Sequence, residues 1–291
     1  MKRTLENERL LIEVEKKGSQ LVRIYDKEKQ REVLWEGNPE FWGKHSPILF
    51  PMIGTCYNNV YHFEGQEYEM ASHGFAWKND FEFKETDGEI TAVLTDSEES
   101  KKIYPFSFAL TISHKLSGNQ VIVSWKVENT GDKTMYYSIG AHPGFRMQEG
   151  VDKTDMYLGF PGKKELPYIL IAEDGSKCAD TQKVYTMPLD EDGCIKVTEN
   201  FWDKDAYIYE HQNIETVGLY NADKTPYVLV HCGQFPYLGV WAKPNAPFIC
   251  IEPWFGRCDD KEFTGELKDK TGICSVEAGQ SKEYSYVIEI A

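Results

Sequence analysis

Basic residues are in the minority in this chain. Its 291 residues include 32 lysines and arginines against 47 aspartates and glutamates, which gives a formal net charge of -15. Nucleic acids and anionic lipid surfaces attract basic stripes. The sequence has no such stripe, so we expect neither a nucleic-acid partner nor a membrane partner. Long apolar runs are also missing, both as bilayer-crossing segments and as a secretion signal at the N-terminus. We therefore expect a cytoplasmic protein.

Paired cysteines and glycine-rich loops are missing as well. The seven cysteines are odd in number and widely spread, and no two have C-x-x-C spacing. This pattern indicates neither a zinc site nor a disulfide framework, so most of the thiols are expected to be small buried side chains. There is no phosphate-binding loop, dinucleotide fingerprint, H-E-x-x-H motif or nucleophile elbow. We expect no metal and no cofactor.

Helical periodicity is nearly absent, and alternation of period two takes its place. Apolar side chains occupy every second position in residues 121–127 and again in residues 284–290. Short runs of this kind, separated by turn residues, recur from end to end and predict an all-β sandwich or barrel in one continuous domain, residues 1–291. The best candidate for a short helix opens at Asn38-Pro39-Glu40, where an N-cap residue precedes proline.

Two histidines and a glutamate stand beside glycine or proline in three short motifs. These are Ser72-His73-Gly74-Phe75, Ala141-His142-Pro143-Gly144 and Ile251-Glu252-Pro253-Trp254. Imidazole and carboxylate groups can exchange protons near neutral pH. His142 follows the strand-like residues 135–139, at a strand end where catalytic groups are often held. The alternative for each histidine is a ring that only bonds to nearby backbone.

Glu252 lies inside an otherwise apolar strand-like run, residues 248–255. Carboxylates are rarely buried without a partner or a task, and burial raises their pKa and makes them more effective bases. The alternative is a carboxylate at a strand terminus that points to water or pairs with Arg257. We favour a functional role for Glu252.

Segments along nearly the whole chain, in this order, resemble the aldose 1-epimerase (galactose mutarotase-like) family, in its LacX-like branch. The resemblance includes the three motifs above and further segments on either side of them. The further segments are Leu34-Trp35-Glu36-Gly37-Asn38-Pro39-Glu40-Phe41-Trp42, His45-Ser46-Pro47-Ile48-Leu49-Phe50-Pro51, Gly65-Gln66-Glu67-Tyr68-Glu69-Met70 and Trp241-Ala242-Lys243-Pro244.

The resemblance implies a large twisted antiparallel β-supersandwich with few helices and an open groove for a monosaccharide. It implies that His142 is the general acid on the ring oxygen and Glu252 the general base on the anomeric hydroxyl. His73 would help to hold the sugar, and no cofactor would be needed. Asp205 is a candidate for the ligand-binding aspartate of the family, and Trp241 and Trp254 could stack against the sugar.

The sequence departs from the family at two positions. Thr55 and Trp77 stand where sugar-binding arginines are usual, and Arg146 is a candidate replacement. The leading hypothesis is an aldose 1-epimerase for a free hexose or related aldose. A non-catalytic carbohydrate-binding or sensing protein and a hexose-6-phosphate 1-epimerase are the alternatives. The protein could be a monomer or a homodimer.

Overall fold

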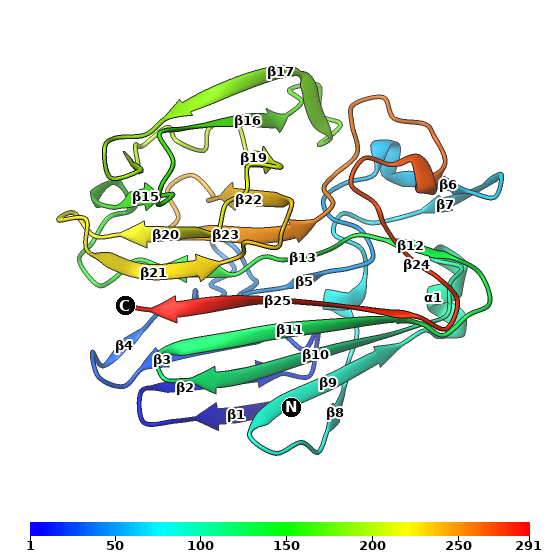
Figure 1. Cartoon of the computed structure of the whole chain (residues 1–291), viewed down its shortest axis with the longest axis horizontal. Coiled ribbons are helices and arrows are strands. Elements are labelled where there is room, and N and C mark those ends of the chain that lie inside the picture. Colours follow the sequence, from blue (N-terminus) through cyan, green and yellow to red (C-terminus); the bar gives the residue numbers. More distant parts are fainter.

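The computed structural model describes residues 1–291, and strands make up nearly all of its regular structure. Every pair of adjacent strands is antiparallel, as in a β-supersandwich (Figure 1). One α-helix, α1 (Glu98–Ile103), is accompanied by four short 3-10 helices: Tyr57–Asn59, Ala76–Lys78, Lys153–Asp155 and Leu267–Asp269. The prediction of an all-β fold with few short helices is confirmed.

The largest sheet has nine strands. Their order is β18 (Cys194–Lys196), β15 (Tyr157–Gly159), β20 (Thr216–Tyr220), β21 (Pro226–His231), β25 (Ser281–Ile290), β11 (Gln120–Asn129), β10 (Phe108–Ser117), β9 (Glu89–Thr95) and β8 (Glu82–Lys84). The alternation read in the sequence shapes this sheet, because β11 and β25 each bury every second side chain. Trp125 pairs with Tyr284 across them, so the apolar sides of both strands face the same core.

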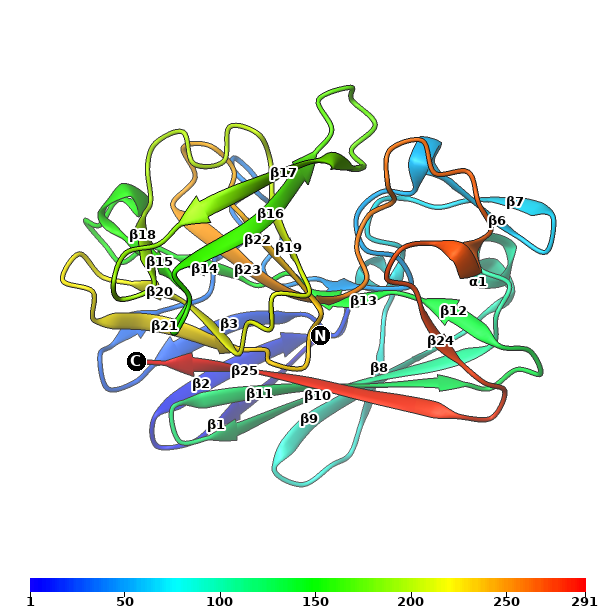
Figure 2. The same ribbon diagram turned by 45° about the horizontal axis from the view of Figure 1, so that its top comes forward.

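The second large sheet has eight strands and carries the functional site. It runs in the order β17 (Ala179–Pro188), β16 (Glu165–Ile171), β19 (Tyr207–Glu210), β22 (Tyr237–Trp241), β23 (Phe248–Phe255), β13 (Ile139–Ala141) and β5 (Ile48–Leu49), and β14 (Gly144–Arg146) also pairs with β23. In Figure 2 the β16–β17 hairpin rises at the top of the molecule.

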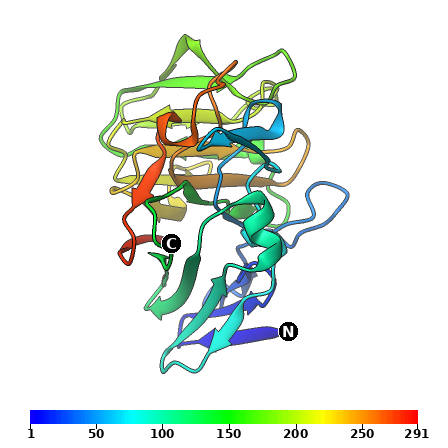
Figure 3. The same ribbon diagram turned by 90° about the vertical axis from the view of Figure 1, so that its right-hand side faces the viewer.

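Three smaller sheets complete the fold. The first is a four-stranded sheet of β1 (Lys2–Glu6), β2 (Leu10–Glu15), β3 (Leu21–Asp26) and β4 (Arg31–Glu32); the others pair β6 (Val60–Phe63) with β7 (Gln66–Glu69) and β12 (Met135–Tyr137) with β24 (Cys274–Val276). The four-stranded sheet lies at the bottom of the molecule in Figure 3, opposite the β16–β17 hairpin at the top.

Strand β23 is buried on both faces, and this decides where the site lies. Its odd-numbered residues Ile249 and Ile251 belong to the main core of 62 buried residues. Phe248, Cys250 and Trp254 on the other face belong to two small clusters of buried apolar side chains. Glu252 shares that second face, because successive side chains of a strand point in opposite directions. A carboxylate is therefore held among apolar groups in the middle of a central strand.

The helix expected to open at Asn38 does not form. Asn38 accepts backbone hydrogen bonds from Phe41 and Trp42, and the turn then ends before Gly43. Glycine is a poor helix residue, and Trp42 is held elsewhere by the site described below. The one α-helix begins instead after Ser97, whose side chain accepts a hydrogen bond from the backbone of Ser100.

The cysteines behave as the sequence predicts. All seven are free, and six of them are buried. Burial raises the pKa of several thiols, including Cys56 and Cys258 to about 12. The protonated thiol is therefore the favoured form of these side chains at neutral pH. As for the helices, none is both long and apolar enough to cross a membrane.

Candidate active site

A cavity of about 270 Å³ opens on the second face of β23. Its volume is just below the usual range of drug-sized ligand sites, which suits a small molecule. Seven of the residues singled out in the sequence line it together: Thr55, His73, His142, Asp205, Trp241, Glu252 and Trp254. The motifs that lie far apart in the chain therefore meet at one place.

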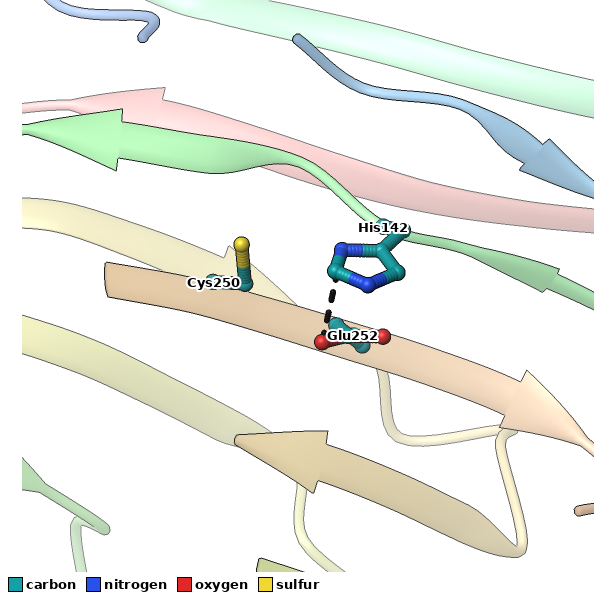
Figure 4. A group of neighbouring side chains, drawn as sticks. All are labelled: His142, Cys250 and Glu252. Atoms are coloured by element: carbon teal, nitrogen blue, oxygen red, sulfur yellow. Dashed lines mark ion pairs between the residues drawn. The ribbon is translucent and has the colours of Figure 1, made fainter. Parts of the chain in front are cut away.

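His142 faces Glu252 because a break in a strand lies beside β23. Gly140 of β13 pairs with Trp254, and Gly144 of β14 pairs with Cys250. His142 and Pro143 connect these two strands, so the histidine falls opposite the position between the two paired residues. Its Nδ1 lies 3.4 Å from Oε1 of Glu252 (Figure 4). Pro143 has no N–H to donate to β23, although its carbonyl accepts the N–H of Ile251 over 3.3 Å.

Burial controls the charge of this pair. His142 is 8% exposed and Glu252 is 1% exposed. Burial, followed by the nearby His73 and Lys44, holds the pKa of His142 well below its usual value. Burial, followed by the neighbouring Asp205, raises the pKa of Glu252 well above its usual value. Burial therefore favours a neutral imidazole beside a protonated carboxyl group.

Nδ1 of His142 has no hydrogen-bond partner, although it is buried, and the same is true of the indole nitrogen of Trp254. Buried polar atoms without partners are uncommon and require an explanation. Both atoms belong to residues that line the cavity. Their unmet hydrogen-bonding capacity is consistent with a polar ligand there.

His73 is fixed by two hydrogen bonds to one residue. Its backbone N–H donates to the carbonyl of Gly54 over 2.8 Å, and its Nδ1 accepts the N–H of Gly54 over 3.1 Å. The accepting role of Nδ1 leaves the proton of the neutral ring on Nε2. Burial, with a smaller effect of Lys44, lowers the pKa of His73 to about 3. His73 is therefore a fixed neutral donor, unsuited to act as an acid at neutral pH.

A steric constraint explains why glycine follows His73 in the motif. Gly74 has a positive φ of 67°, and a Cβ atom there would lie 2.3 Å from the carbonyl oxygen of Phe50. Only glycine fits that close approach. The motif thus brings the His73 loop against the segment that carries Thr55.

Aromatic rings enclose His142. Trp42 stacks on the imidazole with a centroid separation of 4.8 Å, and Trp241 and His73 meet its ring edgewise at 5.7 and 5.6 Å. Stacking of this kind restricts the rotation of the imidazole ring. Trp42 was not among the site residues predicted from the sequence, although it ends a segment that carries the family resemblance.

Several further lining residues were missed. They are Trp42, Ile53, Gly54, Ser72, Ile171, Lys177, Ala206, Ile208 and Cys258. Lys177 and Asp205 stand in loops, each with a positive φ, at 58° and 70°. Lysine seldom adopts a positive φ, so nothing in the sequence indicates the turn that brings Lys177 to the cavity.

Arg146 lies outside the cavity and cannot replace the expected arginines. It pairs with Phe248, four positions from Glu252, which is about 13 Å along a strand. Its Nη1 is 3.8 Å from a carboxylate oxygen of Glu36. Trp77 also lies outside the cavity lining, and the ammonium group of Lys44 sits 3.6 Å from its ring centroid. Thr55 does line the cavity, and no arginine does.

The alternative pairing of Glu252 with Arg257 does not occur. The buried Arg257 guanidinium binds Glu210 and Asp260 instead. The ionisable side chain within ion-pair distance of Glu252 is therefore His142, whose imidazole is neutral. As for metal binding, His142, Cys250 and Glu252 place their ligand atoms within 4.8 Å of one another, so these three side chains are the group that could hold an ion.

A sequence model of the aldose 1-epimerase family matches residues 1–261. The plasmid-encoded protein LacX of Lactococcus lactis is 29% identical over 304 aligned positions, which cover 98% of both chains. A galactose mutarotase related enzyme from Lactobacillus acidophilus superposes with a TM-score of 0.93 and 29% identity, covering 100% of this chain and 97% of that one. A galactose mutarotase-like protein from Lactobacillus casei gives a TM-score of 0.91 and 26% identity, covering 100% of both.

Proposed function

Because this chain belongs to the aldose 1-epimerase family, we propose that it interconverts the α and β anomers of a free hexose or related aldose. The observation that carries this proposal is the buried pair of His142 and Glu252, whose Nδ1 and Oε1 atoms lie 3.4 Å apart. Both side chains line a cavity with further polar groups from His73 and Asp205. Interconversion of anomers requires one group that gives a proton and one that takes a proton, and this pair supplies both.

The reaction would begin with proton transfer at two oxygens of the sugar. His142 gives a proton to the ring oxygen while Glu252 takes the proton of the C1 hydroxyl, and the bond between C1 and the ring oxygen breaks. The open aldehyde rotates about the bond between C1 and C2. The ring then closes on the other face, with the proton transfers reversed. The number of protons on the pair is unchanged at the end.

For the reaction the pair must carry one proton in addition to the N–H of neutral His142, and burial favours its location on Glu252. A C1 hydroxyl that donates a hydrogen bond to the carboxylate stabilises the ionised form of Glu252. Sugar binding therefore favours a shift of the proton to His142, which is the form that can act as an acid. The two groups titrate as a coupled unit, so a pH–rate profile would report apparent pKa values of the pair.

The walls of the cavity suit a sugar. Trp42, Trp241 and Trp254 line the cavity, where the exposed parts of their rings could contact sugar C–H groups. His73 would donate a hydrogen bond from Nε2, and Asp205 at the exposed end would accept one from a hydroxyl group. Thr55 would contact the sugar from the opposite segment of the chain.

A second candidate is a carbohydrate-binding protein with little catalysis. The absence of arginine from the cavity lining favours it, because forked donors would hold the sugar hydroxyls in place for proton transfer. The two candidates predict the same sugar binding and different rates of anomer conversion.

The test compares His142→Asn with His62→Asn, a histidine outside the cavity, and measures mutarotation and calorimetric sugar binding in both. An epimerase should lose about 10²–10⁴-fold in rate with His142→Asn and keep the wild-type rate with His62→Asn. Saturable binding by a folded wild type that does not accelerate mutarotation would support the second candidate. Glucose 6-phosphate serves as a competitor, and its failure to compete would exclude a sugar-phosphate substrate.

A further inference from the structure

The side chains of His142, Cys250 and Glu252 form a compact group on one face of β23 and its neighbour (Figure 4). Cys250 and Glu252 are two positions apart on the strand, so both point to the same side. His142 reaches them from the connection between β13 and β14. The mechanism uses the histidine and the glutamate and leaves the thiol without a role.

The spacing of the acid–base pair matches that of two ligands on one ion. Zinc binds imidazole nitrogen and carboxylate oxygen at ~2.0–2.2 Å, so two such ligands at a tetrahedral angle lie about 3.4 Å apart. The separation of His142 Nδ1 and Glu252 Oε1 is 3.4 Å. All three ligand atoms lie within 4.8 Å of one another, so the sulfur needs to move by only about 1 Å to reach tetrahedral spacing.

A second observation also points to a ligand at this place. His142 is more than nine-tenths buried, yet its Nδ1 atom has no hydrogen-bond partner. The atom that would bind an ion is therefore available, and it faces Glu252. Imidazole, thiolate and carboxylate are each established ligands of Zn²⁺ in proteins.

We propose that His142, Cys250 and Glu252 form a binding site for a thiophilic divalent ion such as Zn²⁺, which blocks the acid–base pair. The Cys250 thiol and the protonated carboxyl group of Glu252 each lose a proton to solvent as their bonds to the metal form. His142 and Glu252 line the cavity, so water from the cavity would complete the coordination of the ion. An ion so placed uses the lone pair of His142 and the carboxylate of Glu252, so it excludes proton transfer to a sugar. The evidence for the ion site is the geometry of the three side chains. The expected inhibition of mutarotation rests on the proposed function.

Cobalt titration tests the site without reference to activity. Co²⁺ is added to the purified metal-free protein and to Cys250→Ala, Cys232→Ala and Cys258→Ala, and the near-ultraviolet thiolate-to-cobalt band is recorded. Cys232 is a buried thiol outside the cavity lining, and Cys258 is a thiol that lines the cavity. We expect the band in the wild type and in the two control variants and its loss in Cys250→Ala. A wild type without the band, or a Cys250→Ala variant that keeps it, would overturn the proposal.

Zinc binding and inhibition complete the test. Removal of a residue that only hydrogen-bonds to a metal ligand typically weakens metal binding ~10–100-fold. Removal of the ligand Cys250 itself should therefore weaken Zn²⁺ binding at least about 100-fold, as measured by calorimetry. Cys250→Ser repeats the comparison with a side chain of similar size, which guards against misfolding of the alanine variant. If mutarotation is observed, Zn²⁺ should inhibit the wild type and spare Cys250→Ala. Cobalt binding without any mutarotation would leave the ion site standing and remove the proposed function.

Discussion

The proposed chemistry of this site depends on the charge states of two side chains, Glu252 and His142. Glu252 is a carboxylic acid on a strand buried on both faces, and His142 is an imidazole between aromatic rings. Water cannot solvate their charged forms, so burial moves the pKa of each toward the neutral form. The reaction we propose moves one proton within this pair, and the residues around it hold the two groups at the required distance.

His73 has a structural role, as the acceptor for the N–H of Gly54, and a proposed binding role, as a donor to the sugar. Two substitutions can distinguish these roles. His73→Asn keeps an acceptor for the N–H of Gly54 and suits the positive φ of 64°. His73→Leu leaves that N–H unpaired, so it should lower the free energy of unfolding by about 1–3 kcal/mol relative to His73→Asn. Both variants lose the donor on Nε2, so sugar affinity should fall in both.

Urea denaturation and calorimetry measure the two effects separately. Equal stability of the two variants would contradict the structural role of the bond to Gly54. Full sugar affinity in His73→Asn would contradict the proposed donor role of Nε2.

The strands of the site are packed around the indole of Trp254. Gly140 of β13 and Gly239 of β22 lie on either side of it, and a Cβ atom at these positions would lie 2.4 and 2.3 Å from indole carbons. Glycine on the two neighbouring strands therefore gives the indole the space it occupies. The position of Trp254 at the cavity follows from this contact between strands.

Gly140→Ala should displace the indole of Trp254 from the cavity wall. Overpacking of a well-packed core typically costs about 1–3 kcal/mol in stability, and we expect a loss in that range. Sugar affinity should fall as well, because the wall of the cavity moves. Gly131→Ala is the control, since a Cβ atom there meets nothing closer than 3.4 Å. Thermal unfolding and calorimetry of both variants decide the matter, and wild-type stability for Gly140→Ala would refute the packing account.

The sequence predicts these strands well, and the loops between them poorly. Period-two alternation indicates β11 and β25, and a glutamate in an apolar run indicates a special role for Glu252. Trp42 and Lys177 reach the cavity from loops, whose paths depend on contacts with distant segments. The same dependence explains the error at Asn38, where a favourable helix start is followed by Gly43 and by a tryptophan held against His142. Arg146 was a candidate for the cavity because it is close to His142 in sequence. That closeness does not show where its side chain points, and Arg146 lies outside the cavity lining.

The protein as a whole keeps three histidines uncharged inside its fold. Burial lowers the pKa of His114 to about 4 and of His73 to about 3, and it holds that of His142 well below its usual value. All three are protonated in the unfolded chain once the pH falls below about 6.5. Glu252 has the opposite effect and accounts for one proton. Above pH ~4.5 it is ionised in the unfolded chain, whereas its raised pKa keeps it protonated in the folded state.

Stability should therefore fall as the pH decreases from 6.5 to 4.5. Three histidine protons bound by the unfolded chain, less one glutamate proton bound by the folded chain, leave two. The free energy of unfolding should thus fall by about 2.7 kcal/mol per pH unit from these four groups. Urea denaturation at several pH values measures the slope, and His114→Gln should reduce it by one proton. A slope that is flat over this interval would contradict the assigned protonation states.

The most direct test of the account is polarimetry on freshly dissolved α-D-glucose and α-D-galactose. Wild type, Glu252→Gln and the exposed control Glu191→Gln are compared under the same conditions. We predict faster mutarotation with the wild type and with Glu191→Gln, and a rate lower by about 10²–10⁴-fold with folded Glu252→Gln. Full acceleration by Glu252→Gln would contradict the assignment of Glu252 as the base on which the proposed reaction depends.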